Sequence, residues 1–186
     1  MPDLQYFLDE QSRLQEVMEE KNGSPHPSSL FTHFLNSQEW PDSIEHQAAS
    51  QALIHMMQWN DKALIHELVE MEAETGWKPW AKSAHVNLEA ARGEWIDMFH
   101  FMLNGALLLG LDDDEIKTRY DAKHAKNEAR QHADYDGVST KCPGCQRALD
   151  DTAVLCRIVN EDEVRGQYWC DVQRDYIYKV KPGALA

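Results

Sequence analysis

Two pairs of carboxylates interrupt apolar helical sequence, and they constrain the fold of this chain more than any other feature. Glu67 and Glu70 form the first pair, and Glu94 and Asp97 form the second, 27 residues further on. The i,i+3 spacing places both side chains of a pair on one helix face, one turn apart. Two such helices packed antiparallel would bring four negative charges together. Hard divalent cations such as Mg²⁺ bind carboxylate oxygens and would offset the repulsion.

The residues around both pairs are mostly apolar. They are Ile65, Leu68 and Met71 near the first pair, and Trp95, Ile96, Met98, Phe99 and Met102 near the second. A solvated helix face would carry more Lys and Arg, so this pattern favours an inward-facing site. Either pair alone is more typical of an exposed helix face. Taken together, the two pairs leave a metal site and a solvated face as evenly balanced interpretations.

Apolar residues at helical spacing predict four main helices, over about 3–21, 41–74, 83–110 and 112–133. The second could be broken near Trp59-Asn60. Residues 23–33 are expected to form a loop, followed by a short and weaker helical segment. Gly76 and Gly110 are suited to ending helices. Four helices with short connections predict an all-α bundle whose site is built from facing helices.

The acidic excess is confined to the first part of the chain. The formal net charge is −14, and residues 1–140 carry 25 Asp+Glu against 11 Lys+Arg, whereas residues 141–186 carry seven of each. Such an excess argues against binding to nucleic acid or to an anionic membrane surface. The N-terminus lacks the basic start and apolar run of a signal peptide, and no stretch is long enough to span a bilayer. We therefore expect a cytoplasmic protein without nucleic-acid or membrane partners.

The last part of the chain has a different amino-acid composition. Residues 153–180 are rich in Val, Ile, Tyr and Trp and carry a Gly at a plausible turn, which predicts short strands. The sequence AspGlyValSerThr at 136–140 breaks the preceding helical pattern. The chain is therefore expected to contain a helical domain over residues 1–138 and a small β-rich appendage over residues 139–186.

All four cysteines lie in this appendage. Cys142-Pro-Gly-Cys145 is a tight CxxC turn of the kind that supplies two thiolates to zinc, and Cys156 and Cys170 could complete a Cys₄ site. The spacing departs from a zinc ribbon, which normally has a second CxxC pair. In the alternative interpretation Cys156 belongs to the apolar core and the CxxC turn is redox-active or idle. A disulfide framework is not expected in a cytosolic chain.

A basic stripe follows the fourth predicted helix. Tyr120, Lys123, Asn127 and Arg130 are separated by steps of three, four and three residues, so they share one face. Lys supplies a point charge and Arg a forked array of donors, and both suit phosphate. A triphosphate bridged by metal and held by these cations is one interpretation. Surface salt bridges to Asp121 or Glu128 are the other.

With these residues in place, the chain resembles the all-α nucleoside triphosphate pyrophosphatases, in particular the dimeric dUTPase branch, which is related to MazG. The resemblance spans roughly residues 4–135. It is carried by the ExxE…ExxD pattern of the two carboxylate pairs, by GlyTrpLysProTrp at 76–80, by LysHisAlaLysAsnGluAlaArgGln with Tyr135, and by GlnSerArgLeuGln at 11–15. The sequence departs from the family in Pro79, in Gln15, and in the absence of a Gly before Tyr135.

The resemblance implies a catalytic metal centre. Glu67, Glu70, Glu94 and Asp97 would bind two or three Mg²⁺ ions, which would polarise the α-phosphate and activate the water that releases pyrophosphate. Glu70 would orient that water or accept its proton. The resemblance also assigns substrate contacts: Lys123, Asn127 and Arg130 would hold the β- and γ-phosphates, with Tyr120, Tyr135 and Lys78 as further contacts.

The same resemblance implies a pyrimidine substrate. Gln11 could recognise the base through its amide, which both donates and accepts hydrogen bonds. Trp77 or Trp80 could pack against base or sugar, although at least one of them is expected in the core, as is His100. The expected reaction is hydrolysis of dUTP to dUMP and pyrophosphate by a homodimer. A dCTP or dual-specificity enzyme, a broader MazG-like enzyme, and a non-enzymatic helical interaction module with a zinc ribbon are the alternatives.

Overall fold

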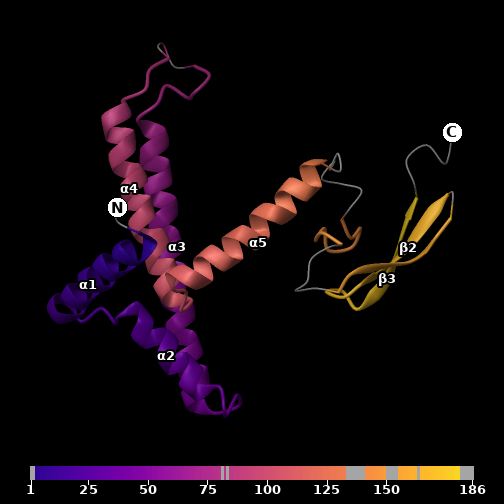
Figure 1. Ribbon diagram of the computed structural model, residues 1–186, viewed down its shortest axis with the longest axis horizontal. Coiled ribbons are helices and arrows are strands. Elements are labelled where there is room, and N and C mark those ends of the chain that lie inside the picture. The colour runs from indigo at the N-terminus through magenta and orange to yellow at the C-terminus, as the bar shows by residue number, and fades with distance from the viewer. Residues whose placement is uncertain are drawn as a thin grey trace. The chain divides into compact units, whose positions relative to one another are not determined.

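The computed structural model describes residues 3–80, 82, 84–132, 141–149, 155–162 and 164–180 (Figure 1). Within these residues the chain forms five helices followed by three strands. The elements are α1 (Leu4–Asn22), α2 (Pro27–Ser37), α3 (Ile44–Ala73), α4 (Leu88–Leu108), α5 (Asp113–His132), β1 (Arg157–Glu161), β2 (Arg165–Cys170) and β3 (Asp175–Val180). The order of elements confirms a helical part followed by a β-rich part.

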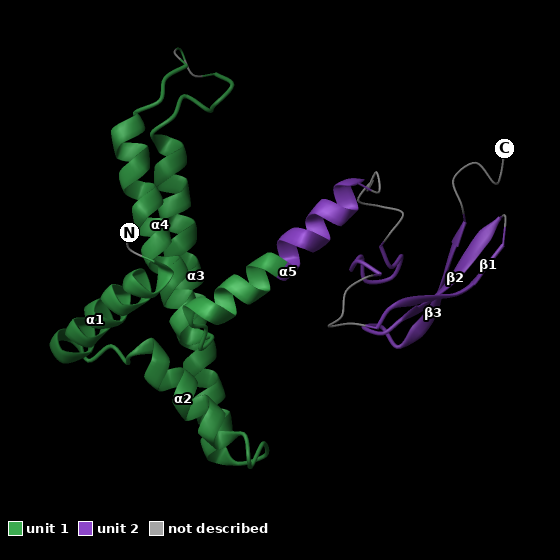
Figure 2. Ribbon diagram, in the orientation of Figure 1, with its two compact units in different colours: residues 1–121 green, residues 122–186 purple. Residues whose placement is uncertain are grey.

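The chain divides into two compact units, residues 1–121 and residues 122–186, and the division falls within α5 (Figure 2). The domain boundary predicted at 138/139 lies outside the described residues and stays a prediction. Among the described residues, no helix combines the length and the apolar character needed to cross a membrane.

The centre of the first unit is an antiparallel pair formed by α3 and α4 (Figure 1). α3 is one continuous helix, so the break considered near Trp59 is absent. The two helices run in opposite directions. Asn60 contacts Phe101, whereas Glu67, later in α3, lies beside Glu94, earlier in α4. α4 begins at Leu88, later than the predicted 83, because the preceding residues close a turn. In that turn Gly76 N–H donates to the carbonyl of His85 at 2.8 Å.

The segment after α1 corrects the sequence prediction, because α2 begins at Pro27 inside the expected loop. Proline fits the first turn of a helix, where its missing N–H has no helical partner. The His26 ring caps the helix by accepting from the Ser28 N–H, and it also lies 3.2 Å from the Ser12 hydroxyl. α1 ends at Asn22, and Gly23 caps it with a φ of 68°, in the left-handed region.

The apolar core of the first unit lies between α1 and α4. Leu8, Leu103 and Ala106 are buried there, with Phe99 and Ile116 packed against them. The turn after α4 needs glycine at position 110, because φ is +64° and a Cβ there would lie 2.0 Å from the Phe31 ring.

Several apolar residues beside the carboxylate pairs are exposed, contrary to the inward placement expected from sequence. Ile65 is 59% exposed, Trp95 53% and Met102 57%. The physical reason is that α1 and α2 pack against α3 and α4 along only part of their length, so these side chains keep an uncovered face in a single chain.

In the second unit, β1, β2 and β3 form an antiparallel meander, which confirms the predicted strands. The β1–β2 register shifts between Ile158 and Asn160. Gly166 lies within β2 instead of at a turn. A Cβ at this position would lie 2.7 Å from the ring of Tyr168.

Candidate functional site

Three of the four predicted carboxylates converge between α3 and α4. Oxygens of Glu67, Glu70 and Glu94 lie within 4.8 Å of one another. Glu67 and Glu70 are one turn apart on α3, and the antiparallel register brings Glu94 of α4 opposite them. Among the described residues only His66 forms an ion-pair contact with this cluster, through Nδ1 at 2.9 Å from Glu70 Oε1. The cluster therefore carries a local excess of negative charge.

Asp97, the fourth carboxylate, lies one turn beyond Glu94 and borders the same site. It is exposed and lines a cavity together with Glu67. Desolvation, together with repulsion by neighbouring carboxylates, raises the pKa of the Glu94 carboxyl. The repelling neighbours are, in decreasing order, Glu70, Asp97, Glu67 and Glu74. The carboxylates of this cluster therefore repel one another, and a bound cation would reduce that repulsion.

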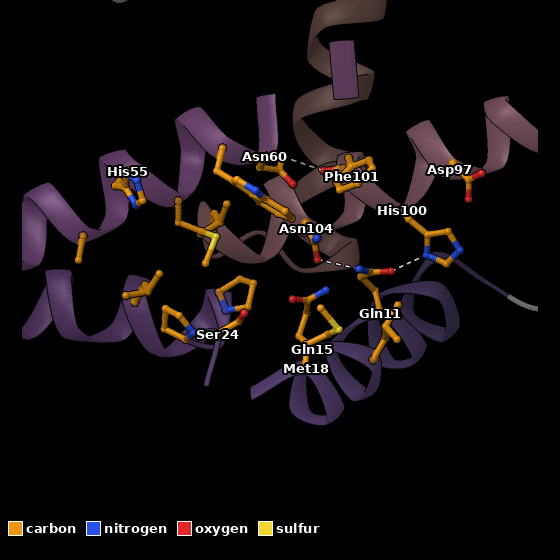
Figure 3. A pocket seen from close by; sticks show the side chains of 18 of the residues that line it. Gln11, Gln15, Met18, Ser24, His55, Asn60, Asp97, His100, Phe101 and Asn104 are labelled. Atoms are coloured by element: carbon orange, nitrogen blue, oxygen red, sulfur yellow. Dashed lines mark hydrogen bonds between the residues drawn. The ribbon is translucent and has the colours of Figure 1, made fainter. Parts of the chain in front are cut away.

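The cavity has a volume of about 700 Å³ and lies entirely within the first unit (Figure 3). Glu67 and Asp97 give it an acidic wall. Other walls are apolar and come from α1, the α1–α2 connection, α2, α3 and α4; they include Leu14, Met18, Pro27, Leu30, Met56, Trp59 and Phe101. A cavity with carboxylates on one wall and apolar surface elsewhere suits a ligand that has both a charged and a flat apolar part.

Gln11 lies at the cavity wall in a relay of three polar side chains (Figure 3). It is 2% exposed; its Nε2 donates to Oδ1 of Asn104 at 2.7 Å, and its Oε1 lies 2.6 Å from Nδ1 of His100. Because an amide oxygen only accepts, the hydrogen of the second bond belongs to Nδ1 of His100. The amide of Gln11 is therefore held in one orientation.

This relay changes one prediction and adds a residue that the sequence reasoning missed. His100 is not a core residue, because its side chain is exposed at the cavity and is fixed by Gln11. Asn104, 5% exposed, was not predicted. A polar residue within an apolar helix is the only sequence signal that could have indicated it, and its partner Gln11 is 93 residues away.

Asn60 is the second missed residue of the cavity wall. Its Nδ2 donates to the backbone carbonyl of Phe101 at 3.0 Å. Its Oδ1 is buried and accepts from no residue that the structure describes. A buried acceptor without a donor is uncommon, because leaving it unpaired costs about 1–3 kcal/mol.

The predicted aromatic–Lys segment forms the turn between α3 and α4. Trp77 and Trp80 are 55% and 76% exposed, so the expectation that at least one belongs to the core is wrong. Lys78 Nζ lies 5.9 Å from the centre of the Trp77 ring. Among the described residues that line the large cavity, none comes from this turn.

The predicted basic stripe lies on α5. Tyr120 is 65% exposed and belongs to the first unit. Lys123, Asn127 and Arg130 follow on the same helix within the second unit, the first two exposed and Arg130 half-buried. Tyr135 lies outside the described residues. Contact between these side chains and phosphate stays a prediction.

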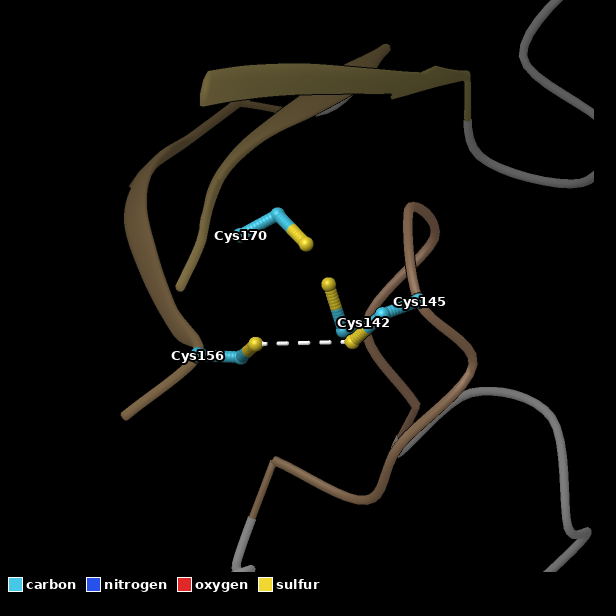
Figure 4. A group of neighbouring side chains, drawn as sticks. All are labelled: Cys142, Cys145, Cys156 and Cys170. Atoms are coloured by element: carbon cyan, nitrogen blue, oxygen red, sulfur yellow. Dashed lines mark hydrogen bonds between the residues drawn. The ribbon is translucent and has the colours of Figure 1, made fainter. Parts of the chain in front are cut away.

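The four cysteines of the second unit converge (Figure 4). Their sulfurs lie within 4.8 Å of one another, and no disulfide joins them. Burial raises the pKa of the Cys145 thiol to about 12. Burial opposes ionisation of Cys142 as well, yet backbone N–H groups of Cys145 and Gly144 and the neighbouring thiols outweigh it and lower its pKa. The convergence of Cys142, Cys145, Cys156 and Cys170 is the one expected for a Cys₄ metal site.

Comparison with known proteins supports the class that this site indicates. A family model described as dUTPase matches residues 3–109, which include Gln11 and all four carboxylates. The chain therefore belongs to this dUTPase family, and its resemblance to the dUTPase/dCTPase branch of the all-α pyrophosphatases is confirmed. The matched residues end before α5 and the cysteines.

A dCTP pyrophosphatase of Enterobacteria phage LZ5 is 38% identical to this chain over 79 residues. The similarity covers 36% of this chain and 45% of the relative, so the chain spans less than half the length of the relative it matches. No solved structure matches the chain.

Proposed function

We propose that this protein hydrolyses pyrimidine deoxynucleoside triphosphates, with dUTP as the substrate, to the monophosphate and pyrophosphate. The observation that carries this proposal is the convergence of Glu67, Glu70 and Glu94 within 4.8 Å beside a cavity with apolar and amide walls. Carboxylates would face the triphosphate through a divalent cation, and the apolar walls would enclose the base. Membership of the dUTPase family supports the same reaction.

The residues present fit Mg²⁺. Glu67, Glu70, Glu94 and Asp97 provide hard oxygen ligands, and desolvation together with the negative charge of the neighbouring carboxylates raises the pKa of Glu94. Two or three bound ions would supply Lewis acidity toward the phosphate and toward the attacking water.

The chain's own residues would handle the proton. Water attacks the α-phosphorus, and the bond to the bridging oxygen of the pyrophosphate breaks. Glu70 would accept the proton of the attacking water. Nδ1–H of His66, 2.9 Å from Glu70 Oε1, would donate to that carboxylate and orient it.

Recognition of the base would depend on the amide side chains of the cavity. Gln11 keeps a second Nε2 hydrogen free of Asn104, and the Nδ2 group of Asn104 provides donors for carbonyl groups of a base. The unpaired Oδ1 of Asn60 would accept a base N–H. Uracil offers an N3–H between two carbonyl oxygens, and cytosine offers a 4-amino N–H and one carbonyl oxygen, so either base could pair with these amides.

A dCTP or dual-specificity enzyme is the second candidate. The dCTP pyrophosphatase of phage LZ5, which resembles part of this chain, favours it. In either case the proposed phosphate contacts are Lys123, Asn127, Arg130, Tyr120, Tyr135 and Lys78. Trp77 is a proposed contact to the base or the sugar.

We also propose that the working form is a homodimer. Ile54, Ile65 and Val69 form an apolar stripe on one face of α3, interrupted by the exposed Gln58 and Asp61, and are 51%, 59% and 57% exposed. Exposed apolar stripes of this kind mark interaction surfaces. A second copy would cover this stripe and explain the uncovered faces of α3 and α4. Light scattering should give twice the chain mass of 21.4 kDa, and a monomer would contradict the dimer.

The function is tested by a nucleotide panel. Purified protein with Mg²⁺ is incubated with dUTP, dCTP, dTTP and dATP in turn, in water enriched in ¹⁸O. We expect dUTP to be consumed fastest, with pyrophosphate released and the label in dUMP, because water attacks the α-phosphorus. Faster use of dCTP would establish the second candidate. Label in pyrophosphate would refute the proposed point of attack, and no consumption of any nucleotide would leave the chain as an interaction module.

A further inference from the structure

The sulfurs of the four cysteines are spaced for a metal and not for disulfides. Sγ of Cys145 lies 3.6 Å from Sγ of Cys156. A disulfide needs about 2.05 Å between sulfurs. A tetrahedral ion with metal–sulfur bonds of about 2.3 Å holds its sulfurs roughly 3.8 Å apart. Cys142 and Cys170 are fully buried, Cys156 is 4% exposed and Cys145 is partly buried, so most of the cluster is shielded from water.

Two backbone turns present these sulfurs. In the first, Gln146 N–H donates to the Cys142 carbonyl at 2.9 Å, and Gln146 has a left-handed φ of 61°. In the second, the β2–β3 turn, Asp171 N–H donates to Cys156 Sγ at 3.3 Å and Gln173 N–H donates to Cys170 Sγ at 3.4 Å. Backbone donors directed at sulfur stabilise negative charge on it, which is what a metal ligand requires.

Gly144 allows the two turns to meet. A Cβ at this position would lie 3.1 Å from Cys170 Sγ and 3.0 Å from a side-chain carbon of Ile177. Both contacts are tighter than ordinary packing, so the glycine is required by the close approach of the CxxC turn to the second turn. This gives a way to disturb the cluster without removing any thiol.

The cysteines are also the core of the unit. Among the described residues of the second unit, the buried cluster consists of Cys142, Cys156 and Cys170, with Cys145, Leu149 and Ile177 packed against it. A unit of this size buries little apolar surface, and small domains of this kind often depend on disulfides or a structural metal for stability. Because these thiols are free and form no disulfide, a structural metal is the remaining way to stabilise the unit.

We propose that Cys142, Cys145, Cys156 and Cys170 bind one zinc ion, and that this ion holds residues 141–180 folded. Four thiolates without an open position are the ligand set of structural zinc, and soft sulfur excludes Mg²⁺ and Ca²⁺ as natural occupants. The site lies outside the residues that match the dUTPase family and is separate from the proposed hydrolysis.

The first experiment measures metal in the full-length protein as purified, by elemental mass spectrometry. We expect one zinc per chain. Cys170→Ser should lower the zinc content to near zero, and Gly144→Ala should weaken zinc binding by at least about tenfold in competition with a chelator, although all four thiols remain. Val172→Ser is the matched control, because it places a serine in the exposed β2–β3 turn without touching a ligand, and it should keep its zinc.

The second experiment measures amide hydrogen exchange before and after a thiol-reactive reagent and a chelator extract the metal. Protection should be lost in β1, β2 and β3 and retained in α3 and α4. The proposal is overturned if the purified protein holds no zinc, if it holds iron instead, if mass spectrometry finds cysteine pairs as disulfides, or if the strands stay protected after extraction.

Discussion

The two units place their clustered ligand residues in opposite settings. The carboxylates of the first unit lie on the flanks of two long helices, half-buried or exposed, and the apolar core of Leu8, Leu103 and Ala106 is a separate feature. Three cysteines of the second unit are buried and form the core cluster among its described residues, and Cys145 packs against them partly buried. In our proposal a metal on the carboxylates would therefore serve chemistry, whereas a metal on the cysteines would serve folding.

The difference follows from what each sequence can bury. The helices of the first unit form their own hydrogen bonds and pack apolar faces, so they can carry repelling carboxylates. Among its described residues, the second unit has short strands and few buried side chains beyond the cysteines, so little apolar packing is available to hold it folded without a metal. The comparison therefore predicts opposite consequences of removing metal from each unit.

Removing magnesium should produce the largest effect. With EDTA present, hydrolysis should stop, because the carboxylates cannot act without the cation that they hold. The helical circular dichroism of α3 and α4 should persist, and activity should return on adding Mg²⁺. Loss of helical structure together with activity would break the contrast between the two units.

Gly110→Ala should destabilise the first unit by about 2–3 kcal/mol, because alanine is strained at positive φ and its Cβ would clash with Phe31. Gly93→Ala is the matched control, since a Cβ at position 93 of α4 has nothing within 4 Å. It should instead stabilise by about 0.5–1 kcal/mol. Thermal unfolding measures both, and equal behaviour of the two variants would contradict the packing at the end of α4.

Gln11→Leu should cost about 1–2 kcal/mol of stability, because Asn104 loses its buried partner. We also expect weaker nucleotide binding, seen as a raised KM. Gln58→Leu, an exposed position on α3, is the control and should change neither quantity. An unchanged KM in Gln11→Leu would remove Gln11 from base recognition while leaving its structural role intact.

Glu94→Gln should change the free energy of unfolding only slightly, and it should stabilise the fold instead of destabilising it. A carboxyl whose pKa is higher in the folded than in the unfolded chain destabilises the fold once it is ionised. In EDTA at neutral pH the variant should therefore melt no lower than the wild type. Any advantage should shrink as the pH falls and the wild-type carboxyl takes up its proton. A clearly lower melting temperature would mean that Glu94 supports the fold.

The long, periodic elements could be predicted from the sequence, and so could the convergence of three carboxylates. Helical spacing defines α3 and α4 over many turns, and the connection over residues 74–87 returns the chain antiparallel to α3. α2 was mistaken for a loop because its proline and serines are typical of loops, whereas here Pro27 and the His26 cap begin a helix.

The rest could not be predicted because it depends on contacts between distant residues. Asn60 and Asn104 are isolated amides in apolar helices, without a spacing that indicates a site. The exposure of Ile65 and Trp95 depends on which helix faces a single chain leaves uncovered, and periodicity alone cannot distinguish a buried face from a dimer face.

The most direct test of the central claim compares turnover of dUTP with Mg²⁺ by Glu94→Gln and Glu89→Gln. Both changes remove one negative charge from α4 at nearly constant volume, but Glu89 lies in the first turn of the helix and pairs with Arg92 outside the cluster. We predict that Glu94→Gln lowers kcat by about 10²–10³-fold and that Glu89→Gln leaves it unchanged. Retention of most activity by Glu94→Gln would contradict a catalytic centre on these carboxylates.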